Sequence, residues 1–357
     1  MIPRLPEASH YMQLPREVLI GRGVAPLVGE TLTRLGFTGP ALVVTGKTVL
    51  PIAGVTVLES LKARDLKTDT MTVESSTTEV VALVEKRIRE TQPDIVVGIG
   101  GGKDIDVAKL SSMKAGRSFV SVPTAASHDG IASPLVSMKG LDRPYSYAAH
   151  SPLAIVADTT IIAQSPYRLV AAGCGDVVAK YTAVRDWKVA HRIKNEYYGD
   201  YAAELALMSS RVVIKNASSI RAMSDSGVRT LVEALISCGV AMSIAGSSRP
   251  CSGAEHLFSH ALAMIAPTPA LHGEQCGVGT IMCAYLHGAN WQLIKEFLQK
   301  IGAPTTAKEL GVPPEYILKA LTSAHSLRPE RYTILGESGL TREAALRVAT
   351  ITGVIEQ

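Results

Sequence analysis

The chain has 357 residues, a hydrophobic fraction of 46% and a formal net charge of +4, values typical of an ordinary globular protein long enough for two modest cores. Its Lys and Arg residues are interspersed, and only 4 Phe and 2 Trp are present, which argues against a basic, aromatic-rich surface that binds nucleic acid. Five cysteines without a C-x-x-C pair argue against a disulfide frame or a zinc finger and favour a reducing compartment.

Neither a signal peptide nor membrane insertion is expected. The first residues carry charges and prolines where a signal peptide has an apolar core. The longest apolar stretch, residues 231–245, is interrupted by Glu233 and Gly239 and is shorter than the roughly 20 residues that cross a bilayer. We therefore expect a cytoplasmic protein.

Short β-branched runs alternate with helical patterns in the first part of the chain. The predicted elements are strands at 41–45, 70–73, 94–99, 118–122 and 152–158, with helices at 55–67 and 78–91. This alternation predicts a Rossmann-like parallel sheet with helices on both faces, an architecture that binds nucleotides. Strand signals fade near residue 155. We place there the boundary between an α/β domain, 1–155, and an all-helical domain, 156–357.

A glycine triplet, Gly100-Gly101-Gly102, joins the strand at 94–99 to the helix that follows it. Glycines at a strand end let the backbone approach a ligand, and the N-terminus of a helix attracts an anion. The triplet therefore predicts a diphosphate site, although a plain tight turn would explain it as well. Asp104 and Asp106 follow, and helix capping alone would account for both.

The loop 123–134 follows the next strand at the same carboxyl edge of the predicted sheet. Thr124, Ser127 and Ser133 offer hydroxyl groups there, and His128 and Asp129 offer ionisable ones. Because open α/β sheets bind ligands at this edge, we interpret the loop as part of a binding site.

Two histidines, His256 and His260, are four residues apart in a helical pattern, so both imidazoles leave one face of the helix. The prolines that follow should end this helix and let His272 return toward it. Buried polar groups need partners, and a shared metal site would supply them. The spacing alone makes all three histidines candidate ligands of a divalent metal, together with one acid from elsewhere in the chain.

Asp176 lies earlier in the chain than the histidines, in a helical pattern among small residues, where capping or metal ligation would explain it equally well. Glu255 and Glu274 flank the histidines, and the same shared site would account for them. Cys174, Cys251 and Cys276 lie near these motifs, and for them apolar packing is favoured over thiolate ligation.

Five motifs occur in a fixed order along nearly the whole chain. They are Gly-Gly-Gly-Lys-x-x-Asp-x-Ala-Lys, Pro-Thr-Ala-Ala-Ser-x-Asp-Gly, Gly-x-Gly-Asp-x-x-Ala-Lys, Ser-Arg-Pro-x-Ser-Gly-x-Glu-His and His-Gly-Glu. In this order the sequence resembles the glycerol dehydrogenase and dehydroquinate synthase-like superfamily. The second and fourth motifs are similar to those of its archaeal glycerol-1-phosphate dehydrogenase branch.

The resemblance implies roles for individual residues. Zinc would be bound by Asp176, His256 and His272, and His260 would face the site without being a ligand. The substrate would contact Asp129, Asp176 and His260, with His260 as the first candidate for proton transfer and Asp129 as the second. The residues implied for the dinucleotide are Gly102, Lys103, Asp104, Ile105 and Asp106 at its phosphates and Thr124, Ala125, Ala126, Ser127 and Ser133 nearer its nicotinamide.

The same resemblance implies an activity. It is the zinc-dependent reduction of dihydroxyacetone phosphate by NADH or NADPH to sn-glycerol 1-phosphate, the backbone of archaeal ether lipids. A sister enzyme that oxidises plain glycerol and a dehydroquinate synthase-like cyclase are the alternatives. Members assemble as homo-oligomers, which implies a dimer or an octamer here, and relatives with similar sites hold iron, which leaves the native metal open.

Two details of substrate and cofactor recognition stay open. Arg143, Lys180 and Arg249 are basic residues near the motifs and are candidates for binding the substrate phosphate. Lys47 follows the strand at 41–45 where an NAD-selective site usually has an acid, and it could accept a 2′-phosphate. We therefore expect the protein to use both NADH and NADPH.

Overall fold

The computed structural model describes residues 10–138 and 146–356. They form two compact units: the first extends to Ala126 and continues from Gly130 to Ser165, and the second contains Ser127–Asp129 and the residues described from Pro166 onward. The division after Ser165 lies later than the boundary expected near residue 155. The reason is that the last strand of the sheet and a short helix after it both pack within the first unit.

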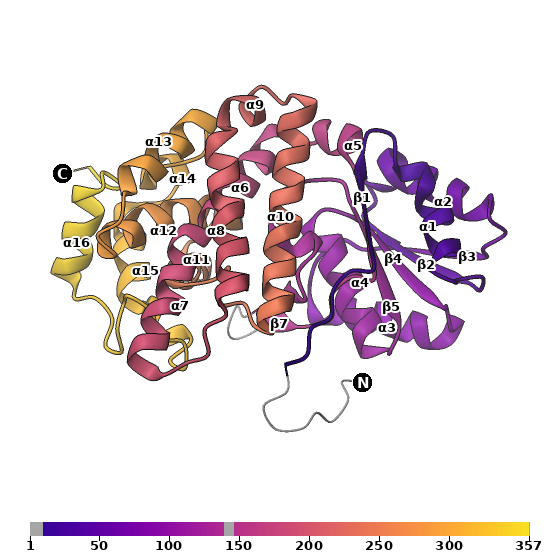
Figure 1. The fold of residues 1–357 in the computed structure, drawn as a ribbon, viewed down its shortest axis with the longest axis horizontal. Helices are drawn as coiled ribbons and strands as arrows, with labels where there is room; N and C mark the ends of the chain where they lie inside the picture. The colour runs from indigo at the N-terminus through magenta and orange to yellow at the C-terminus, as the bar shows by residue number, and fades with distance from the viewer. Residues whose placement is uncertain (1–9, 139–145, 357) are drawn as a thin grey trace. The chain divides into compact units, whose positions relative to one another are not determined.

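The first unit is built on a six-stranded sheet in the order β1-β8-β5-β4-β2-β3, and every neighbouring pair is parallel (Figure 1). Its strands are β1 Glu17–Gly21, β2 Ala41–Thr45, β3 Thr68–Thr72, β4 Ile95–Gly100, β5 Ser118–Pro123 and β8 Ala154–Asp158. A separate antiparallel ribbon pairs β6 Leu135–Ser137 with β7 Ser146–Ala148. The predicted parallel α/β sheet is confirmed.

Helices connect the strands. In the first unit they are η1 Ala25–Leu27, α1 Val28–Arg34, η2 Leu50–Gly54, α2 Val55–Lys62, α3 Thr78–Thr91, α4 Gly102–Lys114 and α5 Thr159–Ala163, and η3 Asp129–Ile131 crosses the division between the units. Helix α2 ends earlier than predicted because the chain turns at Asp65, whose φ of 57° no α-helix accommodates. Helix α3 matches its prediction, since Thr77 caps its N-terminus by accepting a hydrogen bond from the N–H of Val80.

Both faces of the sheet are covered. Alternate strand residues such as Val43, Val97 and Val156 form one apolar cluster with residues of α1 and α2. Helix α4 packs against β4 and β5 and is itself contacted by α3. Its approach is close at Gly98, where a Cβ atom would lie 2.8 Å from the Cβ of Ala108.

The order of the strands places a topological switch point between β2 and β4. From β2 the chain moves outward to β3, whereas from β4 it moves in the opposite direction to β5. Ligands of open α/β sheets bind outside the carboxyl ends of the strands at such a point. Here those ends carry Gly46 on one side and the glycine triplet 100–102 on the other.

The second unit is helical. Its helices are α6 Tyr167–Val178, α7 Lys180–Lys194, α8 Asp200–Lys215, α9 Ala217–Arg221, α10 Asp225–Ala245, α11 Ala254–Ile265, α12 His272–Leu286, α13 Trp291–Ile301, α14 Ala307–Leu310, α15 Pro314–Leu327 and α16 Arg342–Ile351. Helix α12 packs against both α6 and α11, and α11 packs against α15. This packing brings together the three helices that carry the acid and the histidines of the motifs.

Two glycines set the distance between α6 and α12. A Cβ atom on Gly175 would lie 2.2 Å from the carbonyl oxygen of Gly273, and one on Gly273 would lie 1.9 Å from that of Ala172. Neither position therefore tolerates a side chain without moving the backbone. Because Asp176 and His272 are the immediate neighbours of these glycines, the close helix contact brings both residues to one place.

Helix α10 is, among the described residues, the one helix long and apolar enough to span a membrane by those two criteria alone. The helix has 21 residues because it begins before the apolar stretch 231–245. The expectation that this segment is too short to span a membrane is therefore wrong as far as length is concerned. Within the structure, 67% of its apolar window is buried. It packs against α8 and α6, as a core helix does.

Candidate functional site

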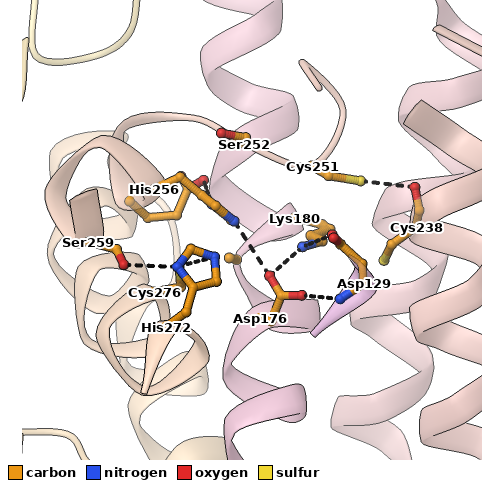
Figure 2. Close-up of polar contacts among 12 residues, drawn as sticks. Asp129, Asp176, Lys180, Cys238, Cys251, Ser252, His256, Ser259, His272 and Cys276 are labelled. Atoms are coloured by element: carbon orange, nitrogen blue, oxygen red, sulfur yellow. Dashed lines mark hydrogen bonds and ion pairs between the residues drawn. The ribbon is translucent and has the colours of Figure 1, made fainter. Parts of the chain in front are cut away.

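Asp176, His256, His272 and Cys276 form one group in the second unit, with ligand atoms that all lie within 4.8 Å of one another. Asp176 comes from α6, His256 from α11, and His272 and Cys276 from successive turns of α12. Figure 2 shows the side chains pointing toward one another from these helices. The two predicted histidine ligands and the missing acid are thus brought together, and the structure adds a thiol.

Asp176 lies in the last turn of α6, so the interpretation that it caps the beginning of a helix is wrong. A carboxylate is disfavoured there, because the C-terminal end of a helix carries partial negative charge. Asp176 is held by Lys180, whose Nζ lies 2.8 Å from Oδ1, and by the backbone N–H of Asp129, which donates to Oδ2 at 2.7 Å. Lys180 also lies 2.8 Å from the carboxylate of Asp129.

Charge stabilises this buried group. Burial by itself would raise the pKa of Asp176, but Lys180 and His256 hold that pKa well below its usual range. Burial would likewise lower the pKa of Lys180, yet the carboxylates of Asp129 and Asp176 raise it well above its usual value. Asp176 therefore stays ionised and can act as a ligand.

His256 is oriented by a carboxylate on its far side. Its Nδ1 lies 2.8 Å from Glu255 Oε1, which leaves Nε2 facing Asp176 Oδ1 at 3.4 Å. Glu255 is fixed in turn by the hydroxyl of Thr182 at 2.7 Å and by the N–H of Gly253 at 2.6 Å. A carboxylate behind a ligating imidazole is the usual support of a metal-binding histidine.

His272 has the same arrangement with a hydroxyl in place of the carboxylate. Its Nδ1 lies 3.2 Å from Ser259 Oγ of α11, and its Nε2 lies 3.5 Å from Cys276 Sγ. His256 thus presents Nε2 to the group while Glu255 holds Nδ1, whereas both ring nitrogens of His272 lie near Cys276 Sγ, Nε2 at 3.5 Å and Nδ1 at 3.8 Å.

The donor set fits zinc. From ordinary zinc–ligand distances, tetrahedral ligands stand about 3.3 Å apart for nitrogen and oxygen and about 3.6 Å apart for nitrogen and sulfur. The corresponding separations here are 3.4 Å between His256 and Asp176 and 3.5 Å between His272 and Cys276. Burial would raise the pKa of Cys276, but the neighbouring His256 and His272 lower it to about 6. Imidazole, carboxylate and thiolate together suit zinc.

His260 lies one turn beyond His256 on α11, and its ring stacks on that of His272 with centroids 5.8 Å apart. It is not a member of the donor group. Burial, and then the charges of His272 and His256, hold the pKa of His260 well below its usual range. Its imidazole is therefore neutral at neutral pH.

Glu274 does not share this site, contrary to the expectation from its sequence position. Its carboxylate accepts hydrogen bonds from Arg168 at 2.6 and 2.7 Å, and it caps α12 by accepting one from the N–H of Leu271. The cysteines also differ from one another. Cys174 is outside the donor group, and Cys251 donates to the carbonyl oxygen of Cys238, whereas Cys276 is not merely an apolar filler.

The edge of the sheet expected to bind the dinucleotide lies in the first unit. Gly101 precedes α4 without a side-chain cap, so the N–H groups of Gly102 and Lys103 have no acceptor within the helix, whereas those of Asp104 and Ile105 donate to the carbonyl oxygen of Gly101 at 3.1 Å. The N–H of Thr124 donates to the carbonyl oxygen of Gly100 at 2.9 Å, which places the loop after β5 beside the glycine turn. The two motifs predicted to share a ligand are therefore adjacent.

Several side chains among the expected cofactor residues point into the protein. Ile105 and Ala126 are fully buried, and the hydroxyl of Ser133 donates to the carbonyl oxygen of Leu135. Their backbone groups are what they could offer a ligand. Lys103 donates to the carbonyl oxygen of Val73 at the end of β3.

Asp106 and Lys109 anchor the loop 123–134 and the ribbon after it. Asp106 Oδ2 accepts a hydrogen bond from the N–H of Ser137 at 2.9 Å, which is not the helix capping that would have explained it. Lys109 is fully buried and donates to the carbonyl oxygens of Gly130 and Leu135 at 2.7 and 2.9 Å. Sequence reasoning did not give Lys109 a role, although it stands three residues after Asp106 on α4.

The basic residues proposed for the substrate phosphate are engaged elsewhere. Lys180 is fully buried between two carboxylates, and Arg249 is buried against Glu196 and the carbonyl oxygen of Tyr332. Arg143 lies outside the described residues. Lys47, proposed for a 2′-phosphate, is exposed after β2 and forms an ion pair with Glu74.

The sequence matches known proteins over nearly its whole length. Residues 19–166 match the family model described as iron-containing alcohol dehydrogenase. A glycerol-1-phosphate dehydrogenase of the NAD(P)+ type from Pyrococcus furiosus is 56% identical over 97% of this chain and 100% of its own. The enzyme of the same name from Methanothermobacter thermautotrophicus is 54% identical over 96% and 99%. The chain belongs to the glycerol-1-phosphate dehydrogenase family.

Solved structures support the fold of this glycerol-1-phosphate dehydrogenase family member. A probable glycerol dehydrogenase from Sinorhizobium meliloti superposes with a TM-score of 0.77 at 22% identity, covering 98% of this chain and 100% of that one. The glycerol dehydrogenase from Schizosaccharomyces pombe gives 0.78 at 20% identity, covering 98% and 94%. At these identities the likeness confirms the fold alone.

Proposed function

We propose that the protein reduces dihydroxyacetone phosphate to sn-glycerol 1-phosphate with NADH or NADPH, with zinc as its metal. The product would be the backbone of archaeal ether lipids. The observation that carries the proposal is the buried donor group in a chain 52–56% identical, over nearly its full length, to enzymes of that name. The protein is proposed to be cytoplasmic and homo-oligomeric, as a dimer or an octamer, and the burial of α10 supports the absence of membrane insertion.

Asp176, His256 and His272 would hold the zinc ion. What supports this set is that the donors converge within one group and that Nδ1 of each imidazole has a partner, Glu255 for His256 and Ser259 for His272. When bound, zinc would act as a Lewis acid on the substrate carbonyl. Lys180 has a separate task here, because its ammonium helps to hold the pKa of Asp176 well below its usual range in the protein without a metal ion.

His260 would carry the proton that the reduced carbonyl oxygen needs. Because its imidazole is neutral at neutral pH, it can give up its N–H proton while accepting another at the second ring nitrogen. Asp129 would hold a substrate hydroxyl, and its own carboxylate is fixed by Lys180. These two residues and Asp176 are the proposed substrate contacts.

The dinucleotide would bind at the switch point of the sheet. The N-terminus of α4, residues 102–106, would meet its diphosphate, with the N–H groups of Gly102 and Lys103 as the donors. Residues 124–127 and Ser133 would lie nearer the nicotinamide, with backbone groups as the main contacts of those whose side chains are buried.

A glycerol dehydrogenase is the second candidate, because the metal and cofactor motifs are equally compatible with an enzyme that acts on unphosphorylated glycerol. The two functions differ in the need for a phosphate. Turnover of dihydroxyacetone phosphate and of dihydroxyacetone, followed by NADPH absorbance, separates them. We expect kcat/KM to be on the order of a hundredfold or more higher for dihydroxyacetone phosphate than for dihydroxyacetone, since recognition of a dianion by charged groups contributes several kcal/mol. Equal efficiencies would favour the alternative.

A further inference from the structure

Arginines gather where the end of α15 meets the loop that precedes α11. Arg328 and Arg331 follow α15, and Arg249 belongs to the loop. Two of the three guanidinium groups have carboxylate partners: Arg249 pairs with Glu196, and Arg328 pairs with Glu330 at 3.1 Å. These two pairs leave Arg331 as the third positive charge of the cluster.

Arg331 binds neutral oxygens. Its Nη1 donates to the carbonyl oxygen of Ser252 at 2.6 Å and its Nη2 to the hydroxyl of Ser248 at 2.6 Å. Across the described ranges 10–138 and 146–356, no carboxylate oxygen lies within 4.0 Å of this guanidinium. The side chain is partly buried, so it keeps an accessible side. The guanidinium of Arg331 therefore adds to the cluster a positive charge that, among the described residues, no carboxylate within ion-pair distance balances.

The neighbouring positive charges affect the pKa of Arg331. Burial, followed by the charges of Arg328 and Arg249, lowers the pKa of Arg331 to about 9. The group is still protonated at neutral pH, but its charge is poorly compensated. An anion bound beside it would relieve the repulsion, and the planar donors of a guanidinium suit a phosphate group.

Arg331 is close to the candidate metal centre. The residue after Ser252, Gly253, donates its N–H to Glu255, and Glu255 in turn holds His256. Figure 2 draws Ser252 in the same close-up as His256, above it in the view.

We propose that Arg331, supported by Arg328, binds the phosphate group of the substrate. The inference rests on the proposed function and adds to it the residues that select a phosphorylated substrate. In dihydroxyacetone phosphate only a CH2–O link separates the phosphate from the carbonyl group, so the two ends need recognition sites that are near each other. Arg331 binds the carbonyl oxygen of Ser252, one residue before the glycine that binds Glu255, and so lies on the side of the centre that carries His256.

Arg331 also joins the segment after α15 to the loop 248–252, and a purely structural tie would explain its two hydrogen bonds. The two roles differ in what a substitution does. Loss of a purely structural contact would lower the stability of the fold and reduce kcat/KM for every substrate to the same extent. Loss of a phosphate contact acts on substrates that carry a phosphate.

The test compares Arg331→Gln with the native protein on dihydroxyacetone phosphate and on dihydroxyacetone. We expect kcat/KM for the phosphorylated substrate to fall on the order of a hundredfold, the value of a lost charge-assisted hydrogen bond, with most of the change in KM. The efficiency with dihydroxyacetone should change by no more than about twofold, since no phosphate contact is lost. Arg342→Gln is the matched control, because Arg342 is an exposed arginine of α16 that pairs with Glu315.

Inhibition by inorganic phosphate gives a second readout. Phosphate should compete with dihydroxyacetone phosphate in the native protein and in Arg342→Gln, and the inhibition should be lost in Arg331→Gln. Equal losses on both substrates, or undiminished phosphate inhibition, would overturn the proposal. If Arg331→Gln does not fold, Arg328→Gln is measured in the same way; an unchanged KM for dihydroxyacetone phosphate in that variant would count against the site.

Failure of the proposed function gives a different pattern. A native protein that does not reduce dihydroxyacetone phosphate refutes the function, and phosphate binding is then measured directly by calorimetry with inorganic phosphate. Heat of binding in the native protein that disappears in Arg331→Gln would still support an anion site at Arg331. Absence of binding in both would refute the site as well.

Discussion

Asp176 and Lys180 form a buried ion pair, with 2.8 Å between Oδ1 and Nζ, where α6 ends and α7 begins. Both side chains are almost completely inaccessible to solvent. The pair explains how a carboxylate can occupy the last turn of a helix, and Lys180 shares its charge with Asp129. One ammonium group therefore positions both acids of the proposed site.

Lys180→Met should destabilise the second unit strongly. It leaves two buried carboxylates without their cation, and breaking a buried pair in this way costs about 3–5 kcal/mol. Trp187 and Trp291 both belong to the second unit, so urea unfolding of the metal-free protein followed by tryptophan fluorescence reports on this unit. Lys215→Met, at an exposed position on α8, is the control. A loss no larger than in the control would mean that the pair does not stabilise the fold.

His260→Ala should keep its zinc and lose its turnover. His260 is outside the donor group, so metal content after dialysis should stay near that of the native protein. Removing a general acid–base group should lower kcat about 10²–10⁴-fold. His272→Ala is the comparison, because it removes a proposed ligand and should lose the metal as well. A metal-free His260→Ala protein would contradict the roles assigned to these two histidines.

Cys276→Ser should weaken metal binding. The sulfur stands 3.5 Å from His272 Nε2, the separation of two ligands on one zinc ion, and we expect the loss to be about 10–100-fold in affinity. Cobalt(II) in place of zinc makes the contact visible, since thiolate bound to cobalt absorbs in the near ultraviolet. The band should be present in the native protein and in Cys174→Ser, and absent in Cys276→Ser. A spectrum without this band in the native protein would exclude Cys276 as a ligand.

Lys47→Ala and Glu74→Ala should shift cofactor preference in opposite directions. Lys47 is the candidate partner of a 2′-phosphate, and Glu74 supplies beside it an acid that could hold ribose hydroxyls. Loss of Lys47 should raise KM for NADPH about tenfold, because one charge-assisted contact contributes about that much. KM for NADH should stay nearly unchanged. Loss of Glu74 should affect NADH instead. If neither variant changes the ratio of KM for NADPH to KM for NADH, the adenosine ribose binds elsewhere.

Local signals in the sequence were enough for the sheet and for one helix in detail. Helix α3 was predictable because a Thr cap and an apolar period of 3.6 coincide, and β2 because a β-branched run ends at a glycine. Edge strand β1 was not predicted in detail, since its half-exposed residues give no comparable run. The ion pair of Lys47 with Glu74 was also out of reach, because it joins residues that follow different strands.

The proposed ligand set followed from the resemblance of motifs, whereas its supporting residues needed the fold. Asp176 gave an ambiguous signal, because the end of a helix is harder to predict than its existence. Cys276 was assigned to packing, although it lies one turn after His272 and that spacing is a usable signal. Arg331 gave none, because its partners lie in a loop far from it in sequence.

The central claim is that a metal centre built on Asp176, His256 and His272 reduces dihydroxyacetone phosphate. The most direct test follows NADPH and NADH absorbance with this substrate, with and without a chelator, and determines the configuration of the product. The account predicts oxidation of both cofactors that stops when the chelator removes the metal and returns with zinc, giving sn-glycerol 1-phosphate. Turnover that survives complete removal of the metal, or a product of the opposite configuration, would contradict it.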